Sequence, residues 1–327
     1  MISSYEKIIK LILPTPFAVG DVNAYVVKND ALTLIDAGVK TEAAWEAFQF
    51  QLAQHGIVPE DIDQVVLTHH HPDHVGLLDW LPEDLPVYGH EYARPWIEED
   101  EQFFAAYDVF YKKLFIEFGI DGDFEKMLKI MKAPLRYSCR RPLTYEITEG
   151  DTIPGMDGWA ILSTPGHAQS HLSFYRNSDG VLLSGDHLLA TISSNPLLEP
   201  ALIPSYERPK PQLQYNHSLR KLLDLDISIA YTGHGAEINK VHELVQRRLQ
   251  RQHERALQVR EMLQGNRLTT FTVTKQLFPA VYQRELGLTL SETTAQLDYL
   301  LSLGFIEKQL DHDGVAYFTS GVTQDEK

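Results

Sequence analysis

The segment Thr68–His74, THHHPDH, carries four histidines and one aspartate. Neutral imidazole is a good ligand for divalent zinc, and a catalytic zinc needs several protein ligands together with an open position for water. On a short loop, His69 and His71 are two residues apart and can point the same way, while Asp73 and His74 follow closely enough to reach a second ion. The segment therefore predicts a metal site, but it holds too few donors to complete two.

A two-metal site requires further histidine or carboxylate donors elsewhere in the chain, because each ion takes about four ligands. Three candidates each follow an apolar stretch that predicts a strand, and each has a glycine beside it that permits a tight turn. They are His167 after residues 159–162, Asp186 after residues 181–182, and His234 after residues 227–230. Together with THHHPDH, these donors predict a dinuclear centre built where strands end.

The elements around these donors alternate short apolar runs with turns and helical patterns. Residues 24–27 and 32–35 predict two hairpin strands, and residues 41–55 have helical spacing that ends at Gly56. Residues 65–67 predict a short buried strand that runs directly into the histidine-rich segment. This order of elements, with the later strands, predicts layered α/β packing.

Residues 96–133 interrupt this rhythm with aromatic side chains at helical spacing, followed by a second helical pattern after residue 123. The simplest interpretation is a helical hairpin that packs its wide apolar face on the core. The alternative is a cap over the active site that supplies an apolar wall for substrate or a dimer contact.

The chain from residue 241 to its end has a different pattern. Residues 243–264 and 273–278 predict helices, a third helix begins at Ser291, which is a candidate cap, and residues 305–318 predict a hairpin. Three helices followed by a hairpin resemble a winged helix. The third helix contains no lysine or arginine, and duplex recognition normally needs such cations. We therefore expect interdomain packing or homo-oligomer formation here, and not nucleic-acid binding.

Composition limits the class of protein. The chain has 327 residues, 43% of them apolar, and a net charge of −16. Residues 1–240 carry 19 basic and 34 acidic side chains, so a polyanionic ligand would meet repulsion there. There is no apolar run of about 18 residues, and the N-terminal segment predicts a first strand and not a signal peptide. The single Cys139 fits a reducing compartment, so we expect a cytoplasmic protein acting on a small molecule, away from membranes.

The motifs resemble the metallo-β-lactamase fold superfamily over roughly residues 5–240. Its early Asp-x-Gly is matched by Asp36 and Gly38. Its His-x-His-x-Asp-His motif is matched by His69, His71, Asp73 and His74, and its later donors by His167, Asp186 and His234. The resemblance implies an α/β fold: a four-layer αββα sandwich, residues 1–240, with the helical insertion at 96–133. A small winged-helix domain, residues 241–327, would follow.

The resemblance also implies a role for each donor. His69, His71 and His167 would hold one ion, Asp73, His74 and His234 the other, and Asp186 would bridge both. His70 would be a ligand of neither ion. Asp36 would orient the ligand loop, His171 would be a turn or supporting residue, and His187 is a candidate for the cleft.

The implied activity is hydrolysis with two divalent metal ions. His71 stands where diiron flavoproteins of this superfamily usually carry glutamate, which favours zinc, although iron and manganese remain alternatives. The nucleophile would be a metal-bridging hydroxide, with Asp73 and Asp186 as catalytic residues and Asp73 orienting the shared water or moving its proton.

The substrate is predicted less directly. The first hypothesis is a small-molecule thioester, ester or lactone, and the segment after Asp186 lacks the Gly-Cys-Gly-Arg type run of glyoxalase II. The runner-up is a phosphodiesterase or endoribonuclease with a local basic patch. That patch would comprise Arg136, Arg140, Arg141, Arg208 and Lys210. An iron-dependent oxidoreductase and a non-enzymatic metal-dependent regulator are further alternatives.

Overall fold

The computed structural model describes residues 7–202 and 207–321. The contacts within the chain divide it into two compact units. The first unit contains the residues up to Asp100, Pro134–Ser194 and Ser218–Leu244. The second contains Glu101–Ala133, Asn195–His217 and the residues from Val245 onward, so most of the insertion groups with the C-terminal elements. Residues 1–6, where the predicted N-terminal segment begins, lie outside the described part.

The first sheet of the first unit runs in the order β1-β2-β3-β4-β5-β6. Its strands are β1 (Lys7–Leu13), β2 (Val22–Lys28), β3 (Leu32–Ile35), β4 (Gln64–Val66), β5 (Val87–Gly89) and β6 (Tyr145–Glu146). β1, β2 and β3 pair antiparallel, which confirms the predicted hairpin, and β3 to β6 pair parallel. The parallel arrangement brings the end of β4, and the histidine-rich segment after it, to the same edge as the ends of β3 and β5.

The second sheet runs in the order β10-β9-β8-β7. Its strands are β7 (Trp159–Ser163), β8 (Leu172–Arg176), β9 (Val181–Gly185) and β10 (Ile229–Thr232). β7, β8 and β9 pair antiparallel, whereas β9 and β10 are parallel. The sequence did not predict β8, because Ser173 and Arg176 interrupt its apolar run, although all five of its side chains are buried.

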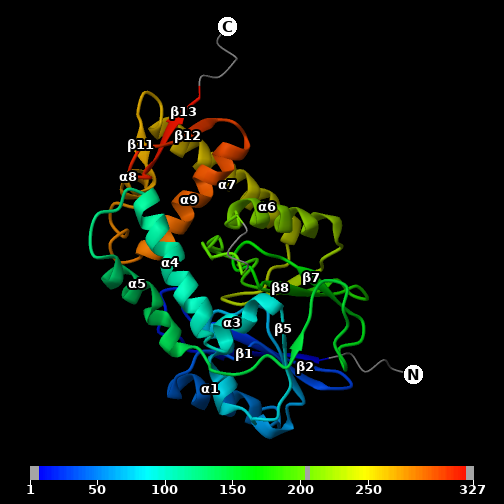
Figure 1. Cartoon of the computed structure of the whole chain (residues 1–327). Helices are drawn as coiled ribbons and strands as arrows, with labels where there is room; N and C mark the ends of the chain where they lie inside the picture. The colour runs from blue at the N-terminus through cyan, green and yellow to red at the C-terminus, as the bar shows by residue number, and fades with distance from the viewer. Residues whose placement is uncertain (1–6, 203–206, 322–327) are drawn as a thin grey trace. The chain divides into compact units, whose positions relative to one another are not determined.

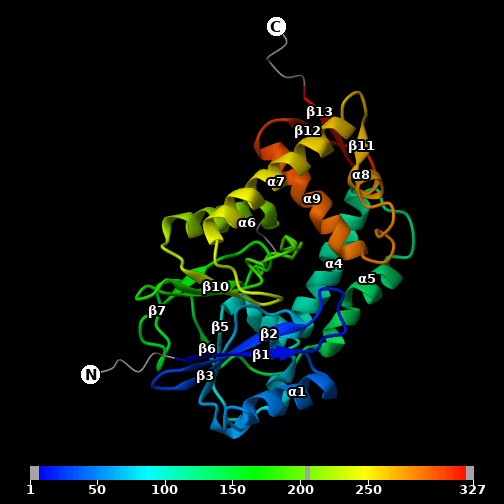
Figure 2. The same cartoon turned by 180° about the vertical axis from the view of Figure 1, so that it is seen from behind.

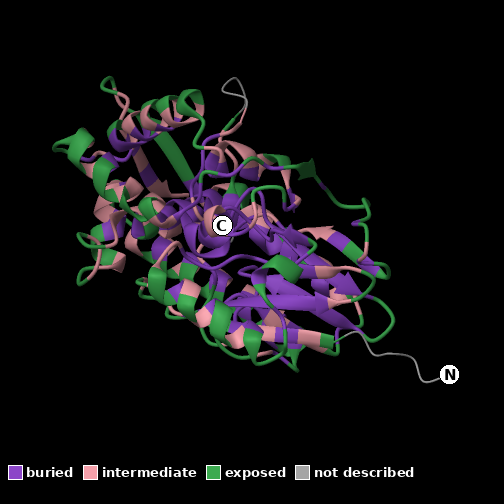
Figure 3. Ribbon diagram, turned by 90° about the horizontal axis from the view of Figure 1, so that it is seen from below, coloured by how far each residue is buried: buried purple, intermediate pink, exposed green. Residues whose placement is uncertain are grey.

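The two sheets of the first unit share one apolar core. Side chains from β2 and β4, such as Val27 and Val66, belong to the same buried cluster as Phe174 of β8 and Leu183 of β9. The other face of the first sheet packs against α1 (Glu42–Ala53), as Figures 1 and 2 show. Figure 3 shows the result as buried strands bordered by exposed helix faces and loops.

Helix α1 illustrates how the sequence positions this layer. Thr41 caps its start by accepting a hydrogen bond from the Ala44 amide. Phe48 and Leu52 repeat at helical spacing and are fully buried, which stabilises the layer by about 1.5–3 kcal/mol per side chain. Gly56 has a φ of +68°, a conformation that glycine adopts without steric cost, and it lies just beyond the helix as predicted.

The second unit is mainly helical. Helices α4 (Glu101–Glu117) and α5 (Phe124–Lys132) form the predicted hairpin, and α8 (Thr270–Leu277), α9 (Leu286–Ser302), β12 (Ile306–Leu310) and β13 (Ala316–Ser320) follow the predicted C-terminal pattern. The short strand β11 (Leu268–Thr269) pairs with β13. Elsewhere in residues 7–202 and 207–321, the other α-helices are α2 (Pro72–Val75), α3 (Arg94–Ile97), α6 (Pro211–Lys221) and α7 (Val241–Met262).

The aromatic hairpin packs within the second unit. On α4, Tyr107, Tyr111 and Phe115 are buried, and the Tyr111 hydroxyl donates a hydrogen bond to the Leu198 carbonyl at 2.5 Å. The Phe118 carbonyl, just after the helix, accepts from the Phe271 amide at 3.0 Å. The apolar face of α4 is therefore a packing surface for residues that follow much later in the chain.

The predicted start of the third C-terminal helix was wrong. Helix α9 begins at Leu286, five residues before the predicted cap Ser291. Ser291 is a buried interior residue whose hydroxyl accepts a hydrogen bond from the Leu198 amide at 3.1 Å. Gly287 weakens the helical pattern of the first turn, and no side chain caps it, so the sequence gives little sign of this start.

Two of the basic residues in the predicted phosphate patch, Arg141 and Arg208, are engaged within the protein. Arg141 is buried and donates to the carbonyls of Leu78, Leu81, Pro82, Glu83 and Leu85 at 2.5–3.5 Å. In the second unit, Arg208 forms an ion pair with the buried Asp298 at 2.8 Å. Arg141 thus shapes the chain between β4 and β5 instead of facing a ligand.

We expect Arg141→Met to lower the free energy of unfolding by about 3 kcal/mol, because several buried carbonyls would lose a charged donor. Denaturant unfolding measures this loss. The matched control is Arg140→Met: that side chain is 71% exposed, so its removal should change stability by about 0.5 kcal/mol or less. Equal losses in the two variants would contradict the structural role of Arg141.

The single cysteine lies in the interior of the first unit. Cys139 is buried, and burial raises the pKa of its thiol to about 12, so it is not a nucleophile at neutral pH. Within residues 7–202 and 207–321, the structure contains no helix with both the length and the apolar character needed to cross a membrane.

Candidate metal centre

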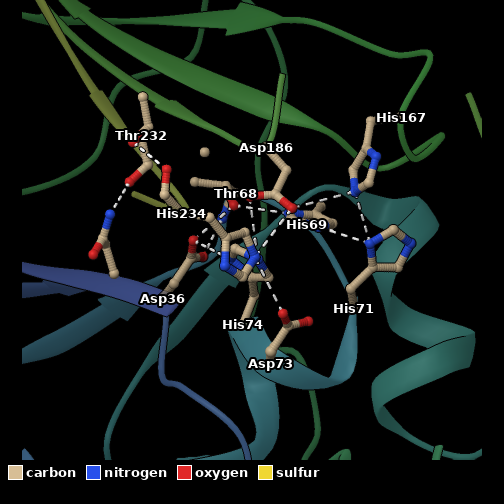
Figure 4. A network of polar contacts seen from close by, with 12 residues as sticks. Asp36, Thr68, His69, His71, Asp73, His74, His167, Asp186, Thr232 and His234 are labelled. Carbon is tan, nitrogen blue, oxygen red and sulfur yellow. Dashed lines mark hydrogen bonds and ion pairs between the residues drawn. The ribbon is translucent and has the colours of Figure 1, made fainter. Parts of the chain in front are cut away.

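The predicted donors come from four segments that follow strands of the first unit. The chain leaves β4 at Val66 and reaches His69 and His71 on a loop, and the single turn α2 then presents Asp73 and His74. Pro72 starts this turn, which suits a residue that lacks a backbone N–H. The later donors His167, Asp186 and His234 follow β7, β9 and β10 in that order. Figure 4 shows all seven donor side chains converging from these four segments.

Three imidazoles form the first donor group. The Nδ1 atom of His71 lies 2.9 Å from the Nε2 atom of His69 and 2.9 Å from the Nε2 atom of His167. His69 and His167 are buried, and one donor atom from each of the three residues lies within 4.8 Å of the others. Three imidazole nitrogens that face one another this closely are typical of a divalent metal site.

The second donor group contains a carboxylate and two imidazoles. Donor atoms of Asp73, His74 and His234 lie within 4.8 Å of one another, and all three side chains are buried. The Nε2 atom of His234 lies 3.3 Å from Oδ2 of Asp73. Of the donors in THHHPDH, His69 and His71 thus lie in the first group, and Asp73 and His74 in the second.

Asp186 lies between the two groups. Its Oδ2 atom is 3.6 Å from Nε2 of His167 in the first group and 3.5 Å from Nε2 of His234 in the second. Its Oδ1 atom is 3.5 Å from Nε2 of His74. One carboxylate therefore reaches donors of both groups, which is the position required of a bridging ligand.

The polar atoms of this cluster test whether the residues fit a cation. His74 Nε2 and Asp186 Oδ1 are buried and make no hydrogen bond with any residue that the structure describes. Burying a polar atom without a partner costs free energy unless another group satisfies it. Nitrogen and carboxylate donors in this proportion suit divalent transition metals, so the residues fit such an ion.

The sequence family agrees with this geometry. The family model described as the metallo-beta-lactamase superfamily matches residues 18–234, which contain every donor named above. The chain belongs to the metallo-beta-lactamase superfamily.

Individual relatives extend the similarity to nearly the whole chain. A probable metallo-hydrolase, YqjP, of Bacillus subtilis is 46% identical over 295 residues, covering 90% of this chain and 92% of that protein. The beta-lactamase-like protein 2 homolog of Caenorhabditis elegans is 24% identical, covering 92% and 82%. The crystal structure of the metallo-beta-lactamase family protein TTHA1429 from Thermus thermophilus superposes with a TM-score of 0.79 at 26% identity, covering 96% and 98%.

In this metallo-beta-lactamase superfamily member, Asp36 supports the histidine-rich loop. Its Oδ1 accepts from the Thr68 amide at 2.7 Å, and its Oδ2 accepts from the Thr68 hydroxyl at 2.8 Å and lies 2.7 Å from Nδ1 of His74. A hydrogen bond to Nδ1 leaves Nε2 of His74 facing Asp186. Asp36 has a φ of +61°, which is strained for a residue with a side chain, so the loop fixes its backbone as well.

His234 is supported from the other sheet. Its Nδ1 atom lies 2.8 Å from the carbonyl of Asp21, just before β2. The Asn23 side chain donates to the carbonyls of Thr232 and Gly235 at 2.9 and 3.0 Å, and so holds the turn on both sides of His234. The first sheet therefore positions a donor that belongs to the second sheet. Sequence reasoning did not single out Asp21 or Asn23, since a backbone carbonyl leaves no mark on residue type.

Electrostatics differ between the two donor groups. Burial lowers the pKa of His69 and His71 well below the usual range, so both stay neutral and keep lone pairs for a cation. Burial also disfavours the charged form of His74 and His234, but Asp186 and neighbouring carboxylates outweigh it, raising the pKa of His74 well above normal and that of His234 to about 10. A cation at the second group therefore competes with protons, and its binding should release them.

The other histidines near the cluster have different environments. His70 is buried, stacks on Trp96 with ring centroids 4.3 Å apart, and lies 2.8 Å from the Ser170 hydroxyl through Nδ1. His187 is fully buried, and its backbone amide donates to Nε2 of His171 at 3.1 Å. Among the residues described, neither side chain is in a group of three close donor atoms that contains Asp186.

Proposed function

We propose that this protein hydrolyses a carbonyl bond in a small molecule, a thioester, ester or lactone, with two divalent metal ions bound by the donor cluster. That it is a metal-dependent hydrolase follows from its superfamily and from its similarity to the probable metallo-hydrolase of B. subtilis. The substrate class, the two-ion mechanism and zinc as the metal are the proposed part.

The observation that carries the two-ion proposal is the position of the Asp186 carboxylate between two complete donor groups. His69, His71 and His167 would hold one ion, and Asp73, His74 and His234 the other, with Asp186 common to both. When bound, such ions polarise a substrate carbonyl and lower the pKa of water towards about 7. A site for a single structural ion would need only about four donors.

The chain's own residues supply orientation and proton transfer. Asp73 lies at the first turn of α2 with Oδ2 3.3 Å from Nε2 of His234, so its carboxylate is held beside the donors. We assign Asp73 the role of orienting the attacking water and accepting its proton, and Asp186 the role of holding the two donor groups in register. Asp36 fixes the segment that carries four of the donors, His69, His71, Asp73 and His74.

The charge distribution supports a small and weakly charged substrate. Residues 1–240 carry a net charge of −15, which disfavours the approach of a polyanion such as RNA. Arg141 and Arg208, two members of the considered basic patch, have partners within the protein. A small molecule with an ester-type carbonyl is not a polyanion, and its hydrolysis does not require a basic phosphate patch.

We also propose that the first unit is an αββα sandwich and that the C-terminal elements form a winged helix. An αββα sandwich is supported by the two packed sheets with α1 on the outer face of one. A winged helix is supported by α8 and α9 followed by the β12–β13 hairpin, with β11 beside β13. Helix α9 has no lysine or arginine, so we propose packing or self-association for this region, and not duplex binding.

A substrate panel tests the proposal. Purified protein should hydrolyse at least one thioester, ester or lactone. A chelator should lower that activity by about 100-fold or more, and added Zn²⁺ should restore it. Phosphodiesters and RNA form the comparison set. Metal analysis of the purified protein should give about two zinc ions per chain. Chelator-sensitive cleavage of RNA alone would replace the substrate assignment, and a single tightly held ion would overturn the two-ion assignment.

A further inference from the structure

His171 contacts the turn that carries Asp186, although it belongs to neither donor group. It is fully buried at the start of β8. Its Nε2 atom lies 3.1 Å from the backbone amide of Asp186 and 3.1 Å from that of His187, and both amides donate to it. Its Nδ1 atom lies 2.9 Å from the hydroxyl of Thr164. All of these residues belong to the first unit.

These contacts fix which ring nitrogen carries the proton. Backbone amides only donate, so the His171 Nε2 atom must offer a lone pair, and the ring proton must sit on Nδ1. Nδ1 then donates to the Thr164 hydroxyl, which can donate onward to the Ser173 hydroxyl at 2.9 Å. The Ser173 hydroxyl in turn points to the Ser184 carbonyl at 3.5 Å. The chain of donors therefore has one direction, set by the two amides.

The imidazole of His171 also limits the space around the turn. Its ring stacks on His69, a donor of the first group, with centroids 5.0 Å apart and planes 28° from parallel. A Cβ atom on Gly185, just before Asp186, would lie 2.9 Å from the Nε2 atom of His171. Gly185 has a φ of +48°, so the backbone turns closely over the imidazole where only glycine fits well.

We infer that His171 is a positioning residue for Asp186: by accepting hydrogen bonds from two consecutive amides, its Nε2 atom aims the Asp186 carboxylate between the two donor groups. The inference rests on the proposed function, since it concerns how a bridging ligand is held. His171 is then not a metal ligand, and its role explains why a second buried histidine follows His167 by four residues.

The first test is the tautomer of His171 in the unmodified full chain. Nitrogen-15 NMR of the histidine side chains should show protonated Nδ1 and unprotonated Nε2 for His171, assigned by its loss in His171→Gln. A proton on Nε2, or a doubly protonated ring at neutral pH, would overturn the inference. The measurement does not depend on catalysis or on bound metal, so it stands even if no substrate is found.

The second test compares two amide replacements of His171. The oxygen of His171→Gln can reach the Nε2 position and accept from the two backbone amides, whereas His171→Asn reaches only the Nδ1 position. In metal-free protein, hydrogen exchange at the amides of Asp186 and His187 should stay slow in the glutamine variant and become fast in the asparagine variant. Zn²⁺ affinity should fall about 10–100-fold in the asparagine variant and much less in the glutamine variant.

Equal exchange rates and equal affinities in the two variants would show that His171 only fills space, and would overturn the inference. If His171→Asn does not fold, Thr164→Val and its control Thr164→Ser replace it. The valine removes the acceptor of the Nδ1 proton while keeping the shape, so it should weaken Zn²⁺ binding more than the serine does. Loss of binding in both variants, or in neither, would contradict the role of the proton on Nδ1.

Discussion

Turnover by the Asp186→Asn variant should be lower than that of the wild-type protein by about 100-fold or more, with the fold unchanged. Replacing groups that only support metal ligands typically costs about 10–100-fold, and Asp186 lies within 3.6 Å of donors from both groups. Burial raises the pKa of this carboxyl, but His234 and His74 outweigh that effect and lower it well below the usual range. Its negative charge, which asparagine lacks, is therefore present at neutral pH.

The measurements are kcat on the substrate found in the panel and zinc content per chain. Zinc should fall from about two ions per chain, because the shared ligand is altered. Asp179→Asn is the matched control: its carboxylate pairs with Arg176 at 2.9 Å in the turn between β8 and β9, away from the donor groups, and activity should be retained. Wild-type turnover in Asp186→Asn, with both ions still bound, would refute the bridging assignment.

The second large effect concerns a residue with no side chain. Gly233→Ala should lose most zinc binding and activity, because a Cβ atom there would lie 2.1 Å from Oδ1 of Asp186 and 3.0 Å from Cε1 of His74. Such a contact forces the carboxylate or the ring out of place. The space beside Gly233, which the Asp186 carboxylate and the His74 ring occupy, is therefore part of the metal centre, although glycine offers no ligand atom.

Gly235→Ala is the control for Gly233→Ala, two residues along the same turn. Nothing lies within 4 Å of a Cβ atom at Gly235, but its φ is +75°. Alanine there should cost about 1–2 kcal/mol of stability through backbone strain while zinc content and turnover persist. Thermal unfolding and zinc analysis of both variants distinguish crowding from strain. Similar zinc loss in the two variants would show that backbone strain in the turn, and not crowding of Asp186 and His74, causes the loss.

Much of the first unit could be predicted from the sequence because its signals are local. The β2–β3 hairpin shows a polar turn between apolar runs, and α1 shows a cap, an apolar stripe and a terminal glycine. The later donors, His167, Asp186 and His234, were recognisable because each follows a strand and has a glycine directly before it. Parallel pairing of β3 with β4 and of β9 with β10 then places strand ends together, which spacing alone suggests only weakly.

The remaining features depend on contacts distant in sequence. The carbonyl of Asp21 reaches a residue 213 positions away, and no residue type marks that contact. Helix α4 packs with elements that follow residue 195, so the role of its aromatic face was not visible in its own periodicity. Helix α9 began earlier than predicted because Gly287 interrupts a pattern that tertiary packing restores.

The donors of each group are far apart along the chain: His71 and His167, whose ring nitrogens are 2.9 Å apart, are separated by 96 positions. A cation shared between them would close that long loop in the folded protein only, since the unfolded chain has no such site. Zinc would then act as a cross-link between the sheets as well as a reagent. Removing zinc should lower the free energy of unfolding of the whole first unit. A substitution that disturbs the packing between the two sheets should weaken zinc binding.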